Sequence, residues 1–543
     1  MATHRSLFKR LNLVRSALII PSDKANSLRL FSQFASTVDI VHETVDDITS
    51  RILRLRSSDG NTASILQNWV DQGHKIKSCE LRDISKRLIK SKRYNHALEL
   101  LAWMDAEKSL WTSPADCATR LELIIKVHGI TKAEEFFSDL PNSILQKAAC
   151  LPLLHFYVKK KDTEKAEALM LKLSDLGLAV SPHLFNEMMK LYMATSQFNK
   201  VPLVILEMKK TNIPLNVLSY NIWMSSCSES SGVAAAEMVY KEMLRDTNVL
   251  VGWTTLATLA NTYMKAGLVQ NALITLRTAE KKLSTCSRVG FLFLITLYAS
   301  LNNREGVLRL WEASKAVRGR ITSANYMCIL WCLVKLGDLE EVERIFMEWE
   351  SECLKYDIRV SNVLLGAYMR NGLMDKVESL HLHTLEKGGC PNYKTWEILM
   401  EGWVKVQNMD KAIDALKNGF PLIKHGKWKP SDSNIVAVAE YFEKQGKVED
   451  AYKYLKFLHQ SGIANLPVYK SLLRLYRCAQ RPAFDILEKM ERDKIELDDE
   501  TSALIQTLRS ECTDHDQSST LPCDQSTPVP PYALKSKFKP INP

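Results

Sequence analysis

The chain has 543 residues, of which 46% are hydrophobic and 25% are charged, and these values exclude a wholly disordered protein. Only 20 Gly and 18 Pro are present, which argues against collagen-like and turn-dense all-β chains. The net charge is +10, but the first 31 residues hold six basic residues and one acid, so the remainder is only mildly basic. That balance permits a nucleic-acid partner without requiring one.

Hydropathy and cysteine spacing narrow the class of protein further. No stretch of 18 apolar residues occurs, and the longest largely apolar one covers residues 291–301, which argues against a membrane-spanning helix. The 12 Cys form no C-x-x-C pair, a pattern that favours reduced thiols in an intracellular compartment.

The first 36 residues have the composition of a targeting segment. They are basic, rich in hydroxyl side chains and nearly free of acids, and their leucines alternate with Arg and Lys as in an amphipathic helix. These properties are typical of an organelle transit peptide. The run Arg29-Leu30-Phe31-Ser32 resembles a plant mitochondrial processing site, which predicts a transit peptide over 1–31 and a location in the mitochondrial matrix. Import into the chloroplast, dual targeting and a cytosolic tail are the alternatives.

Residues 32–77 are expected to hold one or two capping helices, and a repeat follows them. Small apolar residues recur at intervals close to 35, with one longer step of 39 at the end. An aromatic residue lies nine positions before most of them, and a basic residue often follows that aromatic by two. The small residues are Ala97, Ala133, Ala166, Val201, Ala236, Ala272, Val307, Val342, Val377, Ala412 and Ala451.

One repeat, residues 253–287, shows why this pattern predicts a helical hairpin. Leu256, Leu259 and Tyr263 form an apolar face at helical spacing, and Gly267 is suited to the left-handed turn that ends the helix. A second helix starts near Ala272, whose small side chain lets the two helices approach closely. A single hairpin cannot bury both faces, so hairpins stack on their neighbours.

The 35-residue period with aromatic, Lys, Gly and Ala at these offsets resembles the pentatricopeptide repeat, P class. The related 34-residue tetratricopeptide repeat requires a small eighth residue, where this chain has Met189, Met224 and Ile295. The resemblance implies an all-α, right-handed superhelical solenoid of about twelve hairpins over 78–500, followed by a cap remnant and a disordered tail over 501–543. The repeats are predicted to start at 78, 114, 147, 182, 217, 253, 288, 323, 358, 393, 432 and 466.

The resemblance also implies how such repeats recognise RNA. Each repeat reads one base with its fifth and last residues, the reading pair, while its second residue sandwiches the base. Carried over to this chain, Asn186 with Asn216 and Asn362 with Asn392 are complete pairs that favour a pyrimidine. Asn221 is half a pair, because its repeat ends near Val251. The alternative is that each Asn is a polar, solvated position.

The other fifth positions do not fit that pattern. They are Leu151, Ala257, Leu292, Met327, Glu397, Val436 and Lys470, and of these Lys470 is expected to meet phosphate. Arg82, Lys86 and Lys90 fall on one predicted helical face within a basic stretch, where they suit an RNA or ribosome contact. A solvated charged face is the alternative.

No motif for chemistry is found: the sequence has no P-loop, no G-x-S-x-G, no H-E-x-x-H and no deaminase signature. Cys328 with Cys332 and His381 with His383 lack the further ligands of a zinc site. We therefore expect a protein without cofactor, metal, membrane or small-molecule substrate. It would bind single-stranded organellar RNA, mRNA or rRNA, and affect its processing, stability or translation. The alternative is a scaffold in the mitochondrial ribosome or another assembly, with ribosomal proteins as partners.

Overall fold

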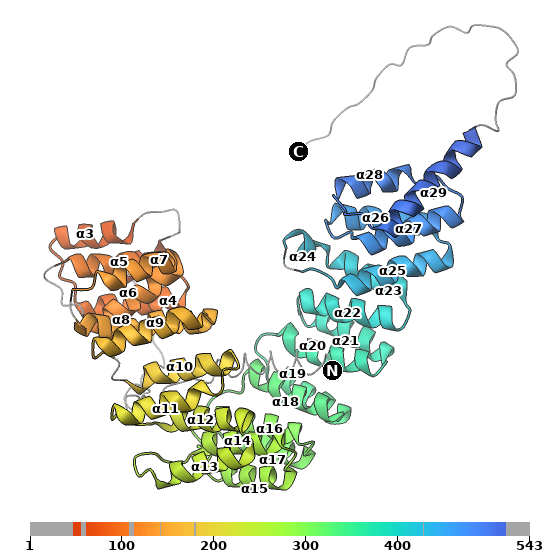
Figure 1. Ribbon diagram of the computed structural model, residues 1–543. Coiled ribbons are helices and arrows are strands. Elements are labelled where there is room, and N and C mark those ends of the chain that lie inside the picture. Colours follow the sequence, from red (N-terminus) through yellow and green to blue (C-terminus); the bar gives the residue numbers. More distant parts are fainter. Residues whose placement is uncertain are drawn as a thin grey trace, which may run out of the picture. The chain divides into compact units, whose positions relative to one another are not determined.

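A computed structural model describes residues 47–55, 61–107, 113–141, 143–178, 181–426 and 428–516 (Figure 1). Within these ranges every regular element is a helix, and the helices α2–α29 fall into two compact units that divide between Arg320 and Ile321. The predicted transit peptide, residues 1–31, lies outside the described residues.

Unit 1 begins with α2 (Ile48–Arg54) and α3 (Thr62–Asp71), inside the segment predicted to hold capping helices. Seven hairpins follow, each made of a first and a second helix. They are α4 (Ser78–Lys90) and α5 (Tyr94–Ala106), α6 (Pro114–Val127) and α7 (Ile130–Ser138), α8 (Ser143–Lys160) and α9 (Thr163–Asp175), α10 (Pro182–Ala194) and α11 (Lys200–Lys210), α12 (Val217–Ser230) and α13 (Val233–Arg245), α14 (Trp253–Lys265) and α15 (Val269–Glu280), and α16 (Val289–Ser300) and α17 (Arg304–Lys315).

Unit 2 holds five hairpins and a final helix. Its elements are α18 (Ser323–Leu336) and α19 (Leu339–Glu352), α20 (Ile358–Arg370) and α21 (Met374–Glu386), α22 (Tyr393–Lys405) and α23 (Met409–Asn418), the short α24 (Phe420–Lys424), α25 (Asp432–Gln445) and α26 (Val448–Gln460), α27 (Leu466–Cys478) and α28 (Phe484–Arg492), and α29 (Asp499–Asp516).

Within each unit the hairpins stack in chain order. First helices pack on one another, as α8, α10, α12, α14 and α16 do in unit 1 and as α18, α20, α22, α25 and α27 do in unit 2. Most second helices pack between their own first helix and the next one, as α13 does against α12 and α14. The predicted fold class, an all-α solenoid of about twelve helical hairpins, is confirmed.

The turn inside each hairpin contains one residue in the left-handed region of φ. Six of these residues are Gly, including Gly267 at φ +76°, which confirms the predicted left-handed turn there. Polar residues fill the same place elsewhere, at some conformational cost because they carry a Cβ. The twelve turn residues are Lys92, Gly129, Lys161, Ser196, Gly232, Gly267, Asn302, Gly337, Gly372, Gln407, Gly446 and Gln480.

The recurring small residues lie where the two helices of a hairpin meet, and all eleven of them are 0% exposed. A polar clamp beside them joins neighbouring hairpins. The Tyr192 hydroxyl donates to Glu167 Oε1 at 2.8 Å, and Lys200 Nζ reaches the same oxygen at 2.7 Å. Mainly because of the hydrogen bond from Lys200, the pKa of the Glu167 carboxyl lies below its usual value. Equivalent tyrosine–glutamate bonds are Tyr157–Glu134, Tyr263–Glu237, Tyr298–Glu280 and Tyr368–Glu343.

Three boundaries differ from the sequence expectation. Helix α8 begins at Ser143 and not at 147, because the helix gains a further turn after Pro141. The longer step of 39 residues accommodates α24 between α23 and α25. Helix α29 extends to Asp516, well into the segment 501–543 that was expected to hold a cap remnant and a disordered tail, and residues 517–543 lie outside the described residues.

Candidate nucleic-acid interface

The reading pair of the repeat that starts with α10 is joined by hydrogen bonds across two hairpins. Asn186 is on the first turns of α10, and Asn216 is the N-cap of α12 in the next hairpin. Asn186 Nδ2 donates to Asn216 Oδ1 at 3.2 Å, and the Ser219 hydroxyl donates to Asn186 Oδ1 at 2.8 Å. We call these three residues the cap network, because Asn216 Oδ1 also accepts the backbone N–H of Ser219 at 3.0 Å.

The repeat that starts with α20 builds the same network. Asn362 Nδ2 donates to Asn392 Oδ1 at 3.2 Å, and Thr395 Oγ1 donates to Asn362 Oδ1 at 2.9 Å. Asn392 is the N-cap of α22 and accepts the backbone N–H of Thr395 at 3.2 Å. The last residue of a repeat therefore does two tasks at once: it caps the next helix and orients the fifth residue.

Both fifth residues are covered in this structure. Asn186 is 1% exposed and Asn362 is 7% exposed, so the alternative that they are solvated positions is wrong for these two. The cap oxygen fixes which end of each amide is the nitrogen, because Asn216 Oδ1 and Asn392 Oδ1 accept backbone N–H groups and an amide oxygen facing them could form no hydrogen bond. Each amide keeps one N–H and one lone pair for a further partner, which is the pair of groups that a base edge requires.

Asn221 lacks the network, as its missing partner predicts. The cap of the next first helix, α14, is Gly252, which has no side chain to offer. Asn221 Oδ1 and Thr255 Oγ1, the counterparts of the amide and hydroxyl oxygens of the cap network, are both buried without a hydrogen-bond partner. A buried polar atom without a partner destabilises the free protein and is satisfied by a ligand that brings a donor.

Lys470 is a correction to the sequence expectation. This fifth residue was expected to meet phosphate, but its ammonium lies 2.5 Å from Asp498 Oδ2 and 2.9 Å from Glu500 Oε2. Asp498 caps α29 by accepting the backbone N–H of Thr501 at 2.9 Å. The last repeat thus joins its fifth and last residues through an ion pair, which neutralises the charge that a phosphate would need.

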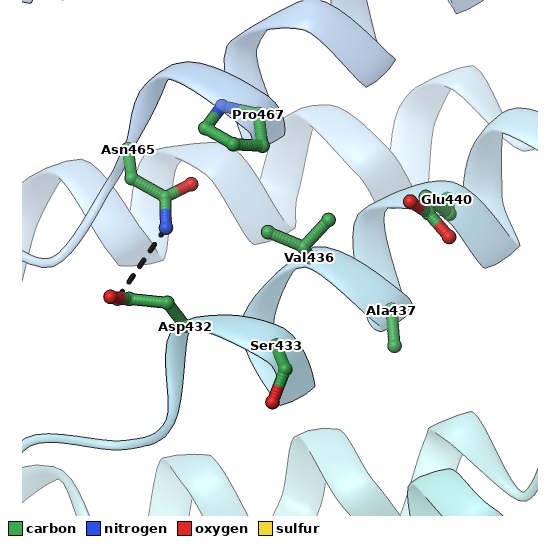
Figure 2. Close-up of a pocket in the computed structure, with 7 residues that line it drawn as sticks. All are labelled: Asp432, Ser433, Val436, Ala437, Glu440, Asn465 and Pro467. Atoms are coloured by element: carbon green, nitrogen blue, oxygen red, sulfur yellow. Dashed lines mark hydrogen bonds between the residues drawn. The ribbon is translucent and has the colours of Figure 1, made fainter.

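A cavity of about 520 Å³ marks the same place in the repeat that starts with α25 (Figure 2). Its walls include the second, fifth and last residues of that repeat, Ser433, Val436 and Asn465, and Pro467 from the next one. Asn465 Nδ2 donates a long hydrogen bond of 3.5 Å to Asp432 Oδ1 (Figure 2). Val436 offers no hydrogen bond, so the fifth residue of this repeat cannot distinguish one base from another.

The basic residues of α4 divide into two groups. The Arg82 guanidinium is held by Asp116 of α6, with Nη2–Oδ2 at 2.8 Å and Nε–Oδ1 at 3.0 Å. Burial alone would raise the pKa of the Asp116 carboxyl, but the hydrogen bonds from Arg82 and Ser113 hold it below its usual value. Lys86 and Lys90 are exposed, and Lys86 forms only a surface pair with Asp83 at 3.0 Å. Arg82 therefore joins two hairpins, while Lys86 and Lys90 face solvent.

Several residues of this interface were missed from the sequence. Ser219 and Thr395 carry the hydroxyls that orient the two amides, and their shared place three residues after a cap Asn is a pattern that a search for capping boxes would have found. Four of the five glutamates of the tyrosine clamp follow the small residue of their helix by one position, Glu280 being the exception, and that regularity was also visible in the sequence.

The described residues contain no group of three His, Cys, Asp or Glu placed to hold a metal ion. His383 Nε2 is 3.0 Å from a carboxylate oxygen of Glu350, and His381 packs edge-on against Trp396. Among the helices that the structure describes, none has the length and apolar character needed to cross a membrane.

Comparison with known proteins places these observations in a family. A family model for the PPR repeat matches residues 218–247, 325–354 and 360–388. A pentatricopeptide repeat-containing protein of Arabidopsis thaliana is 54% identical over 471 residues, which cover 86% of this chain and 96% of the relative. A second Arabidopsis thaliana relative, named as mitochondrial, is 30% identical over 84% of this chain and 92% of its own length.

Among solved structures, the pentatricopeptide repeat protein PPR10 from maize is similar, with 16% identity and a TM-score of 0.48 over 84% of this chain and 70% of PPR10. PPR10 in complex with an 18-nt psaJ RNA element gives a TM-score of 0.34, again with 16% identity, over 87% of this chain and 66% of PPR10. On the strength of the Arabidopsis relatives, which are matched over nearly their whole length, the chain belongs to the pentatricopeptide repeat family.

Proposed function

We propose that this protein binds single-stranded RNA along its first helices and acts by occupancy, without chemistry of its own. The observation that carries the proposal is the cap network, which is built in the same way in two repeats that lie far apart in the sequence. In each network an amide is oriented by a hydroxyl and retains one donor and one acceptor. A bound RNA is thereby protected from nucleases or kept open for processing or translation.

Base selection rests on Asn186 and Asn362, with Asn216 and Asn392 as their orienting partners. Asn221 is a weaker contact, and Lys86 and Lys90 supply charge for phosphates. The second residues beside the two networks are His183 with Leu218 and Arg359 with Lys394, and each couple can flank a base. The fifth residues of the two complete pairs are five repeats apart, so the target has pyrimidines five nucleotides apart.

Mitochondrial RNA is the proposed target. Several relatives carry the word mitochondrial in their names, and the first 31 residues have the composition of a transit peptide. We propose the matrix as the site of action, with the chloroplast as the less favoured compartment. A fusion to a fluorescent protein, with and without residues 1–31, tests this: a signal that stays in the cytosol with the segment present would refute it.

A scaffold in the mitochondrial ribosome is the second candidate. The specific observation in its favour is the state of the other fifth positions: Ala257 is 0% exposed and Lys470 is ion-paired. A row of repeats with few reading pairs suits rRNA backbone or protein better than a unique sequence.

Selection from random RNA with the full chain tests the first candidate. We expect enriched pyrimidines at the spacing given above. Asn186→Ala and Asn362→Ala should each weaken binding to the enriched RNA by about 1 kcal/mol or more, roughly fivefold in Kd. Asn248→Ala, an exposed residue in the loop before α14, is the control and should leave Kd unchanged. Salt-sensitive binding without an enriched motif would refute base selection and favour the scaffold, which co-sedimentation with ribosomes would then test.

A further inference from the structure

Three consecutive second helices of unit 1 expose apolar side chains at the same place in the repeat. Leu203 of α11, Met238 of α13 and Ile274 of α15 each follow the buried small residue of their helix by two positions. They are 63%, 70% and 64% exposed. We call them the apolar row. The helices lie side by side, because Lys209 of α11 forms an ion pair with Glu242 of α13 and because α13 and α15 both pack on α14.

The same place in other hairpins is polar or small. It holds Glu99, Glu135 and Ala168 before the row and Arg309, Arg344, Ser379, Asp414 and Lys453 after it. The apolar row is therefore not a general property of the repeat. Exposed apolar side chains in a contiguous patch mark interaction sites far more often than isolated ones do.

Cations lie beside the apolar row on the same face. On each helix the residues three and seven positions after the row residue share its face. These positions hold Leu206 and Lys210 on α11, Lys241 and Arg245 on α13, and Arg277 on α15 with Lys281 as its C-cap. The five cations are exposed, and none has a carboxylate partner among the described residues. The acids of this face are Glu207 and Glu242, and Glu242 is already paired with Lys209.

We propose that this face docks an acidic amphipathic helix of a protein partner. An apolar stripe of that helix lies on Leu203, Met238 and Ile274, while carboxylates on its flank meet the adjacent cations. With helices packed about 10 Å apart, three of them span about 20 Å, which about 14 residues of a helix cover. Charge complementarity selects the occupant. An apolar row alone would bind any hydrophobic segment, but the five unpaired cations beside it disfavour segments that are themselves basic.

The face is separate from the proposed RNA site, since the reading pairs lie on first helices and their caps. The two proposals can therefore fail independently. The triple variant Leu203→Ser, Met238→Ser and Ile274→Ser should retain the RNA affinity of the unmodified chain, because all three side chains are exposed and none contacts a cap network.

A peptide-display selection with the full chain tests the docking face. A library of 16-residue random peptides is selected on the unmodified chain and counter-selected on the triple variant. We expect enriched peptides with apolar residues at i, i+3 or i+4 and i+7, and with Asp or Glu beside them. An enriched peptide should bind about tenfold or more weakly to the triple variant and to the double variant Lys241→Glu and Arg277→Glu.

Matched controls come from exposed residues on second helices of unit 2. The double variant Met347→Ser and Leu382→Ser is the control for the apolar row, and Lys456→Glu is the control for the cations. Neither should alter peptide binding. Failure to enrich any peptide that depends on the apolar row overturns the proposal, as does enrichment of peptides without acids. Vesicles of phosphatidylcholine with phosphatidylserine are the last arm: binding to them that is lost in the triple variant would assign the face to a membrane surface instead.

Discussion

Two adjacent repeats of unit 1 have the same fold and differ at their last residue, which caps the first helix of the next repeat. The repeat that starts with α10 ends in Asn216, which caps α12 and binds Asn186. Its neighbour ends at Gly252, so Asn221 Oδ1 and Thr255 Oγ1 are buried without partners. The comparison teaches that one side chain both caps a helix and orients the fifth residue that we propose as a base reader, so that losing the cap also removes that partner.

Removing the cap from the complete repeat should have the largest effect. Asn216→Ala deletes the N-cap of α12 and leaves Asn186 Nδ2 buried without its acceptor, which should cost about 2–3 kcal/mol of stability. Asn221→Ala in the neighbouring repeat removes an atom that has no partner and should change stability by less than about 0.5 kcal/mol. Hydrogen exchange of the α12 and α14 amides measures the local change in stability in each variant. Equal losses of stability in the two variants would contradict the shared role of the cap.

An Asn introduced in place of Gly252 should give the repeat that starts with α12 the hydrogen bonds found in the repeat that starts with α10. Gly252→Asn is compatible with the backbone, which is extended there at φ −99° and ψ −176°, and a Cβ at this position meets no atom within 4 Å. The new amide can satisfy Asn221 or Thr255, so we expect a gain of about 1 kcal/mol in stability.

The same variant should tighten binding of RNA that carries a pyrimidine next to the one read by Asn186. Fluorescence anisotropy with matched RNAs, with pyrimidine or purine at that position, measures the gain. Equally tighter binding to the pyrimidine and the purine RNA would show that the variant stabilises the protein without adding base selection.

The ion-paired repeat extends the comparison to pH. The hydrogen bond from Lys470, followed by those from Thr501, holds the pKa of Asp498 well below its usual value. A lowered carboxyl pKa stabilises the fold above the unfolded value near 3.8, and that contribution is lost as pH falls below it. The double variant Lys470→Asn and Asp498→Asn imitates the neutral Asn pair. It should therefore flatten the loss of α29 protection between pH 5 and pH 2, as hydrogen exchange can measure, and an unchanged acid dependence would contradict the assignment.

The smallest expected effect concerns the hairpin turns of the two repeats that start with α10 and α12. Ser196 has φ +59°, whereas Gly232 occupies the equivalent turn of the next repeat at φ +84°. Ser196→Gly relieves the steric cost of the left-handed region but increases the entropy of the unfolded chain, which should leave a gain of about 0.5 kcal/mol. Calorimetry of the two proteins measures the shift in Tm, and a lower Tm for the variant would show that the serine is not strained.

The period and the hairpin turns could be predicted from the sequence because they depend on local properties. Ala272 and its counterparts are small since two helices cross there, and Gly267 is in a turn that requires positive φ. The start of α8 could not be placed, because its first turn adds helical residues ahead of the 35-residue pattern.

The candidate site was only partly predictable. The residues of the two complete pairs follow from repeat position, but their hydrogen bonds to the hydroxyls of Ser219 and Thr395, which belong to the next hairpin, do not. The role of Arg82 was hidden for the same reason: Asp116 is 34 residues away, and charge patterns within one helix do not reveal a partner on another. Contacts between hairpins decide which polar groups remain available to a ligand.

The tyrosine clamps also determine how the chain can acquire its structure. Each one joins residues only 18 to 26 positions apart, as Tyr192 with Glu167 and Tyr298 with Glu280 do. Contacts of such short range are closed quickly and do not require the far end of the protein. Folding can therefore start at any hairpin and spread to its neighbours, so the early hairpins can fold while the ribosome is still making the later ones.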